Sequence, residues 1–401
     1  MIDVDTFRAA ARAWHATMVP EFGRDARRGL TDEQDLALGR RYMAAKYDAG
    51  FGGIHMPEEF GGRGLSGLHK IAYDMEEAQH GFPTVYFGIS LGMPIPIIMK
   101  FCEDKAWVRE RVIAALKGEE IWCQLFSEPA GGSDLAGLRM KAEQDGNGWK
   151  LNGQKLWTSH AHIADYGIIV ARSDPTVPKH KGLTYFWVDM HAEGVEAKPF
   201  ELLDREVVCN EVFFDDVKLT DGQRIGPVGG GFGVAMATLM IERYVASDAD
   251  GFGPTIPFFV DFAREVQFNG KPAIEDGRIR SAIARNYALR NGLRSIRDRA
   301  FLMMEAGMEP GPEGSLSKLV SVRSRQKLCE LAIDLQGSEG LAYDREAFGQ
   351  EDWVASWLSV PTGRIAGGAD EMLLNTIAER ILGLPQDHRP DKGVPFNQIP
   401  A

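Results

Sequence analysis

The sequence predicts an α+β protein in which helices come first, a compact antiparallel β domain follows, and helices return towards the end. Three observations predict this order. Apolar residues recur at helical spacing up to about residue 118. Short β-rich segments separated by turns fill residues 120–226, and long helical patterns follow a glycine cluster at 229–233. We therefore expect an N-terminal helical domain, a middle β domain and a C-terminal helical domain at 1–120, 121–230 and 231–401.

Helices are predicted on both sides of the β domain. Thr31 begins a capping box with Gln34 and opens a periodic run that ends at Gly50. Further helices are expected over residues 66–80, 104–118, 234–247, parts of 279–308, 315–335 and 371–382.

The middle domain carries strand and turn signals. The apolar residues before Asn152 and Gly153 lead into a dipeptide that is typical of a two-residue hairpin turn. Strands are predicted over residues 166–171, 183–188 and 212–214.

Composition narrows the class of protein. The formal charge of −12 argues against nucleic acid as a partner, because binding DNA or RNA needs a basic face. The cysteines show no CxxC pairing and are expected to be free thiols in a reducing compartment: Cys102, Cys123, Cys209 and Cys329. The N-terminus is acidic, and no apolar run of about 18 residues occurs, so we expect neither a signal peptide nor a membrane span. A cytoplasmic location follows as the expectation.

Several common site motifs are absent from the sequence. The glycine clusters do not complete G-x-G-x-x-G, and there is no P-loop, HExxH or GxSxG. His160 and His162 have no third ligand nearby, so we interpret them as solvated loop histidines and expect no metal site. Ser133 has no evident His–acid partner, which makes it a turn residue rather than a nucleophile.

One carboxylate stands out. Residues 232–246 are almost entirely apolar or small, which predicts a buried helix, and Glu242 lies within it. Burial raises a carboxyl pKa by up to ~3–5 units and makes the ionised group a stronger base. The alternative is a buried ion pair. Arg243 is a weak partner for it, because adjacent residues on a helix do not face each other. Both interpretations remain open at this point.

Five motifs in order resemble those of the acyl-CoA dehydrogenase family, over residues of about 52–385. They are MPEEFGGRG at 56–64, QLFSEPAGGSD at 124–134, NGQKLWTS at 152–159, EVFFDDV at 211–217 and IAGGADEM at 365–372. The resemblance implies an N-terminal helical domain, a middle β domain and a C-terminal four-helix bundle. It also implies FAD bound between the β domain and the C-terminal helices.

The resemblance further implies roles for individual residues. Gln124, Phe126 and Ser127 are expected to line the flavin edge, Trp157 to pack on the isoalloxazine ring, and Ser159 to bond near flavin N5. An aromatic side chain with a few placed donors suits a flat aromatic cofactor.

Other roles fall on the substrate and on the last motif. Ser133 matches the position that contacts the CoA part of the substrate, and Gly367 provides a backbone N–H to the thioester oxygen. Ala369 and Glu371 belong to the flavin-binding loop, although Ala369 replaces the usual threonine and lacks its hydroxyl donor. The stretch around Asp334 matches only loosely the segment that contacts FAD across a subunit interface in relatives.

The family removes the α-proton with a carboxylate while hydride leaves the β-carbon for flavin N5. Many members carry that base at the position of Gly367, where a glycine cannot act. Isovaleryl-type and long-chain-type members instead place it in an L-x-x-E-R stretch, which LMIER at 239–243 matches. The resemblance therefore implies Glu242 as the base, with Arg243 on the substrate side.

The implied function is α,β-dehydrogenation of an acyl-CoA in lipid β-oxidation, with electrons passed to an electron-transferring flavoprotein. A homotetramer or dimer and a branched or bulky acyl group are expected. The first alternative is a non-catalytic or half-site subunit of a heterotetramer. The second is a flavin oxidase, a monooxygenase or a nucleic-acid-binding relative, against which Glu242 and the acidic charge weigh.

Overall fold

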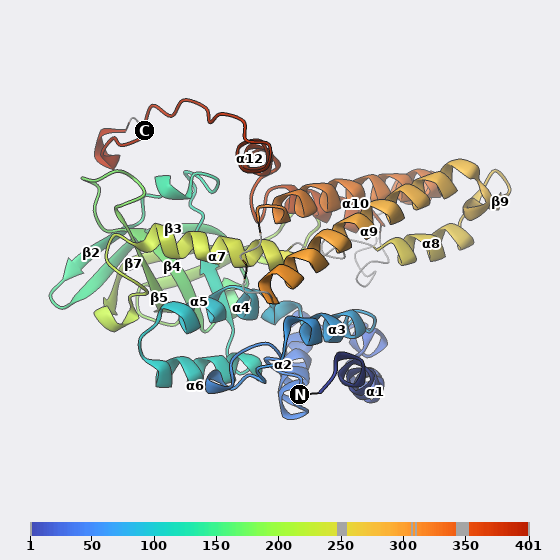
Figure 1. Ribbon diagram of the computed structural model, residues 1–401, viewed down its shortest axis with the longest axis horizontal. Coiled ribbons are helices and arrows are strands. Elements are labelled where there is room, and N and C mark those ends of the chain that lie inside the picture. Colours follow the sequence, from blue (N-terminus) through green and yellow to red (C-terminus); the bar gives the residue numbers. More distant parts are fainter. Residues whose placement is uncertain (1, 247–254, 306–307, 309–310, 342–352, 400–401) are drawn as a thin grey trace. The chain divides into compact units, whose positions relative to one another are not determined.

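The computed structural model describes residues 2–246, 255–305, 308, 311–341 and 353–399 (Figure 1). The chain divides into two compact units. Unit 1 comprises Met1–Glu201, Val207–Ile241 and Arg389–Ala401, and unit 2 comprises Leu202–Glu206 and Glu242–His388. Helices, a β-sheet and further helices follow one another in the predicted order. Among the described residues, no helix is both long and apolar enough to cross a membrane.

Unit 1 begins with helices, one of which carries the predicted capping box. The Thr31 hydroxyl accepts from the Gln34 N–H and the Gln34 side chain accepts from the Thr31 N–H, which confirms the capping box. Asp104 caps another predicted helix by accepting from the Trp107 N–H. The helices are α1 (Val4–Phe22), α2 (Asp32–Asp48), α3 (Gly67–Glu77), α4 (Gly88–Gly92), α5 (Pro94–Phe101) and α6 (Lys105–Leu116).

The strands of unit 1 form one sheet in the order β1-β4-β2-β3-β7-β6, with β5 also paired to β4. The expected antiparallel pairing is present, and parallel pairings of β1 with β4 and of Lys141 with Arg172 are added to it. The strands are β1 (Trp122–Leu125), β2 (Lys141–Asp145), β3 (Gly148–Ser159), β4 (Tyr166–Arg172), β5 (Leu183–Asp189), β6 (Val195–Phe200) and β7 (Cys209–Thr220).

Strand β4 is buried on both of its faces. Ile169 and Ala171 join a core that includes Tyr42 of α2, whereas Ile168 and Val170 join a second core with helices α5 and α6. Successive side chains of a strand point to opposite faces, so a strand with helices on both sides needs an unbroken apolar run. This explains why β4 reads YGIIVAR and not as an alternating strand.

The hairpin predicted at Asn152 and Gly153 is wrong. Both residues lie inside β3, and the chain turns earlier, between β2 and β3. The Asn152 side-chain amide instead bonds across the sheet to Asp216. Asn152 Nδ2 donates to Asp216 Oδ1 at 2.8 Å, and the Asp216 N–H donates to Asn152 Oδ1 at 2.9 Å. Asp216 lies at φ 50° where β7 carries an extra residue opposite β3. The turn-forming dipeptide therefore lies opposite a β-bulge.

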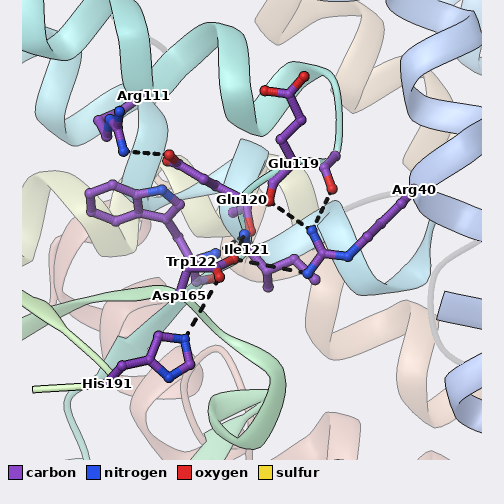
Figure 2. Close-up of polar contacts among 10 residues, drawn as sticks. Arg40, Arg111, Glu119, Glu120, Ile121, Trp122, Asp165 and His191 are labelled. Carbon is purple, nitrogen blue, oxygen red and sulfur yellow. Dashed lines mark hydrogen bonds and ion pairs between the residues drawn. The ribbon is translucent and has the colours of Figure 1, made fainter. Parts of the chain in front are cut away.

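A polar cluster fixes the start of β1 beside the start of β4 (Figure 2). The Asp165 carboxylate accepts from the Ile121 N–H at 2.8 Å, and the Arg111 guanidinium pairs with Glu120. Burial raises the pKa of Glu120 to about 7. These contacts tie α6 to the strand that leads into the QLFSEPAGGSD motif.

Helix α7 (Gly231–Ala246) confirms the predicted helix and crosses from unit 1 to unit 2 after Ile241. The expectation that it is buried all round is wrong for its described side chains. Val234, Ala235 and Thr238 are buried against the sheet, whereas Met240 is 44% exposed. An apolar sequence therefore buries only one face of this helix within the described chain.

Unit 2 is helical, with a short β-hairpin of β8 (Gln267–Phe268) and β9 (Lys271–Pro272). Helices α9 and α10 pack side by side (Figure 1). Their core includes Phe259, Val322, Cys329 and Trp353. The helices are α8 (Ile256–Glu265), α9 (Gly277–Glu305), α10 (Gly314–Gln336), α11 (Trp353–Ser359) and α12 (Asp370–Thr376).

Candidate active site

Trp157 projects from a β-bulge in β3. Lys155 pairs with Val212 and Thr158 pairs with Asn210, so β3 carries one more residue than β7 between these pairs. Trp157 lies in the bulge at φ 62°, and the residue is 58% exposed to solvent. Bulges redirect side chains next to binding sites, and this one places a large aromatic ring at the surface of unit 1.

The bulge is tied to the loop that follows β1. The Leu156 N–H donates to the Ser127 carbonyl at 2.9 Å. The Lys155 ammonium donates to the Phe126 carbonyl at 3.1 Å and to Glu128 Oε1 at 2.8 Å. The structure therefore brings the second and third sequence motifs together through main-chain groups and one buried lysine.

The Glu128–Lys155 pair is buried, and each partner forms further hydrogen bonds to the main chain. Lys155 has no exposed surface, and burial lowers its pKa. Glu128 Oε2 accepts from the Arg139 N–H at 2.6 Å and the Met140 N–H at 3.3 Å. Such a pair fixes geometry, because neither partner can turn to water. The sequence analysis missed this pair, although both residues lie inside the motifs.

The predicted flavin-edge residues cluster here but differ in what they offer. Gln124, Ser127 and Ser159 are half-buried. The Phe126 side chain is buried edge-on against Tyr185, with ring centroids 5.9 Å apart, and only its main chain is available.

Ser133 lies in an exposed turn, as its sequence context indicated. The turn begins where the Gly131 N–H bonds the Glu128 carbonyl at 3.0 Å. A Cβ at Gly132 would lie 3.0 Å from the Ser127 hydroxyl, so glycine allows the turn to fold closely over Ser127.

The last motif forms a second assembly, within unit 2. Gly367 and Gly368 lie at φ 66° and 101°, a region that favours glycine. The buried Lys318 of α10 donates to the Gly368 carbonyl. Asp370, 3% exposed, accepts from Arg323 Nε at 3.0 Å and Arg364 Nε at 2.9 Å. Charged groups of α10 therefore hold the glycine loop at Gly368 and at Asp370.

The remaining predicted positions lie in the same unit. Ala369 is the N-cap residue of α12 without a side-chain cap, and Glu371 is exposed in its first turn. Asp334 is exposed near the end of α10. Glu242 and Arg243 lie in α7, but their side chains are outside the described residues.

His160 and His162 lie in the short turn that follows β3. Within the described ranges, no group of three His, Cys, Asp or Glu side chains could hold a metal ion. The interpretation of both as solvated is wrong for His160, which is 8% exposed at φ 60°. Burial lowers the pKa of His160 to about 4. All four cysteines are free, as predicted.

The residues of unit 1 fit a flat aromatic cofactor. The exposed Trp157 indole offers an apolar ring, and the half-buried residues Ser127, after β1, and Ser159, at the end of β3, carry hydroxyls that can form hydrogen bonds. The buried Thr158 hydroxyl between them has no partner among the described residues.

Comparisons with known proteins agree with this arrangement. Models of the acyl-CoA dehydrogenase N-terminal, middle and C-terminal domains match residues 3–120, 123–217 and 229–382. Acyl-CoA dehydrogenase IpdE1 of Mycobacterium tuberculosis is 35% identical over 399 residues, which cover 96% of this chain and 99% of the relative. The chain belongs to the acyl-CoA dehydrogenase family. It is an acyl-CoA dehydrogenase with the fold that the motifs implied.

Solved structures share this fold at lower sequence identity. The Tcur3481–Tcur3483 steroid ACAD superposes with a TM-score of 0.79 at 23% identity, over 96% of this chain and 98% of that one. The ChsE4–ChsE5 complex from Mycobacterium tuberculosis has a TM-score of 0.76 at 21% identity, with coverage of 96% and 98%. A glutaryl-CoA dehydrogenase from Mycobacterium smegmatis in complex with FADH2 has a TM-score of 0.75 at 20% identity, with coverage of 96% and 97%.

Proposed function

We propose that this chain oxidises the Cα–Cβ bond of an acyl-CoA to a trans-2-enoyl-CoA, with Glu242 as the base and FAD as the cofactor. The observation that carries the proposal is the pairing of a glycine at 367, in the loop where many relatives hold the base, with a glutamate on α7. Glu242 accepts the α-proton, and Arg243 contacts the substrate. The Gly367 N–H stabilises the negative charge that develops on the thioester oxygen.

FAD, when bound, accepts the hydride that leaves the β-carbon. Gln124, Ser127, Trp157 and Ser159 would hold its ring system from unit 1, together with the main chain at Phe126. Ala369 and Glu371 would contact it from the last motif. Support comes from the exposed indole of Trp157 and from the FADH2-bound relative that shares the fold.

The proposed substrate is a CoA thioester with a bulky acyl group, whose CoA part contacts Ser133. The steroid ACAD that shares the fold supports a polycyclic acyl group. The proposed electron acceptor is an electron-transferring flavoprotein. The proposed domain boundaries remain 1–120, 121–230 and 231–401.

The test is anaerobic mixing of the purified flavoprotein with straight-chain, branched and steroid-derived acyl-CoA thioesters, while flavin absorbance is followed. We expect rapid bleaching with a bulky thioester and roughly a thousandfold or greater loss of the bleaching rate in Glu242→Gln. Glu265→Gln, an exposed change on α8, is the matched control. Undiminished bleaching in Glu242→Gln would assign the base elsewhere, and faster bleaching by short straight chains would overturn the bulky substrate.

A half-site subunit is the second candidate, because Ala369 offers no hydroxyl or side-chain cap at a flavin-binding position. The ChsE4–ChsE5 complex supports a heteromeric assembly. In that case the chain purifies without flavin and no thioester is oxidised until a second, homologous chain is added. Flavin-loaded, active homo-oligomers would exclude this candidate.

A further inference from the structure

A buried arginine, Arg172, joins separate segments of unit 1. It ends β4 and is 5% exposed. Its guanidinium donates to the carbonyls of Ala136 at 2.5 Å, Leu138 at 3.0 Å and Lys179 at 3.2 Å. The first two carbonyls lie directly after the Ser133 turn. Arg172 therefore holds one end of that turn through the main chain.

The C-terminal segment 389–399 packs on the same arginine. The Phe396 ring centroid lies 3.6 Å from the Arg172 guanidinium carbon. The Phe396 N–H donates to the Val177 carbonyl at 3.0 Å, and the Asn397 N–H donates to the Pro175 carbonyl at 2.9 Å. A cation over an aromatic face is most favourable when it is withdrawn from water, as this guanidinium is.

Lys179 links the same segment to the Ser133 turn a second time. Its ammonium contacts Asp134 Oδ2 at 2.9 Å and Asp391 Oδ2 at 2.6 Å. Both contacts are charge-assisted, because they join an ammonium to carboxylates. They are also partly shielded from solvent, because the Lys179 side chain is only 15% exposed. Asp134 follows Ser133 directly, whereas Asp391 belongs to the C-terminal segment.

We propose that residues 389–399 are a positioning element for the CoA part of the substrate, acting on the Ser133 turn through Arg172 and Lys179. This inference rests on the proposed function, in which Ser133 contacts CoA. The turn itself is exposed, and its anchors are Arg172 at one end and Lys179 at Asp134. Loosening the anchors lowers the population of the binding conformation and weakens substrate affinity.

The predicted signature is a change in KM without a change in kcat. In the proposed mechanism the C-terminal segment takes no part in removing the α-proton or in stabilising the thioester oxygen, so its loss removes binding that is equal in ground and transition states. Asp391→Asn combined with Phe396→Ala is expected to raise KM, and the dissociation constant of free CoA, by roughly tenfold. Saturating kcat and flavin content stay at the wild-type level.

The experiment compares steady-state rates of the flavoprotein with calorimetric titration by CoA alone. Phe396→Tyr keeps a ring over Arg172 and is expected to retain the wild-type KM, and the exposed Lys392→Gln is a control on the same segment. An unchanged KM in the double variant, or a fall in kcat in place of a rise in KM, overturns the inference. So does a Phe396→Tyr variant as weak as Phe396→Ala. A wild-type protein that binds CoA but oxidises no thioester overturns the proposed function instead.

Discussion

The motif assemblies of unit 1 and unit 2 are each held by ion pairs, but these pairs lie in different environments. In unit 1, the side chains of Lys155 and Glu128 are 0% and 5% exposed. In unit 2, Asp370 is 5% exposed at its side chain, but its partners Arg323 and Arg364 are 44% and 39% exposed. A pair that is wholly dry loses far more when one partner is removed, because the remaining charge has no access to water.

The two units also differ in which residue types adopt positive φ angles. Unit 1 holds Trp157, which is not a glycine, at φ 62°, whereas unit 2 uses Gly367 and Gly368 for its positive φ angles. A tryptophan there costs roughly 1 kcal/mol or more unless surrounding contacts enforce it. The comparison teaches that the Trp157 bulge needs its neighbours to enforce a positive φ angle, whereas the glycines of unit 2 adopt positive φ angles without that cost.

The largest effect that this comparison predicts is on Glu128→Gln. The change leaves the Lys155 charge buried, and we expect the free energy of unfolding to fall by about 3–5 kcal/mol. Urea denaturation and bound-flavin absorbance measure the loss. The double variant Glu128→Gln with Lys155→Met removes both charges and is expected to recover much of it. A loss below about 1 kcal/mol for the single variant would contradict the conclusion that the pair is buried away from water.

The pH dependence of stability tests a second buried group of unit 1, His15. His15 is fully buried, and burial lowers its pKa from 6.5 to about 4. The unfolded chain therefore takes up a proton below pH 6.5, while folded His15 does so only near pH 4. Its contribution to stability is complete above pH 6.5 and falls by about 3 kcal/mol as the pH drops to 4.

His15→Phe is expected to flatten this part of the profile. Urea midpoints recorded between pH 4 and pH 7 measure it, and an unchanged slope in His15→Phe would assign the acid sensitivity to other groups.

The smallest effect on stability is predicted for Asp370→Asn. Because both arginines remain hydrated, we expect a loss of only about 1–2 kcal/mol. The Gly367 loop loses its anchor, so kcat is expected to fall by roughly tenfold. Asp261→Asn is the matched control, since Asp261 forms an exposed pair with Arg264 on α8. A stability loss as large as that of Glu128→Gln would remove the distinction between the dry ion pair of unit 1 and the partly hydrated ion pairs of unit 2.

Local signals predicted the helices well. Thr31 caps the helix that it was expected to cap, because an N-cap hydrogen bond closes within three residues, and Asp104 caps the helix predicted over residues 104–118 in the same way. The strand signal at 166–171 was also correct, since its apolar run reflects burial on both faces. The motifs identified Trp157 and Ser133 as site positions, although their role in binding stays a prediction.

Errors arose where a local preference met a distant partner. Asn152 and Gly153 favour a turn, but the bulge of β7 satisfies the Asn152 amide within the sheet. His160 was predicted to be a solvated loop histidine, but the fold buries it. The Glu128–Lys155 pair was missed because no local spacing links residues 27 positions apart.

The sequence by itself determined the order of helices and strands, the family motifs and the glycine at position 367 of the last motif. These depend on residue type and near neighbours along the chain. The tertiary structure decided which charges are dry, where the bulge turns Trp157 outward, and that Phe396 lies over Arg172. Burial and long-range pairing set those features, and both depend on residues that only folding brings together.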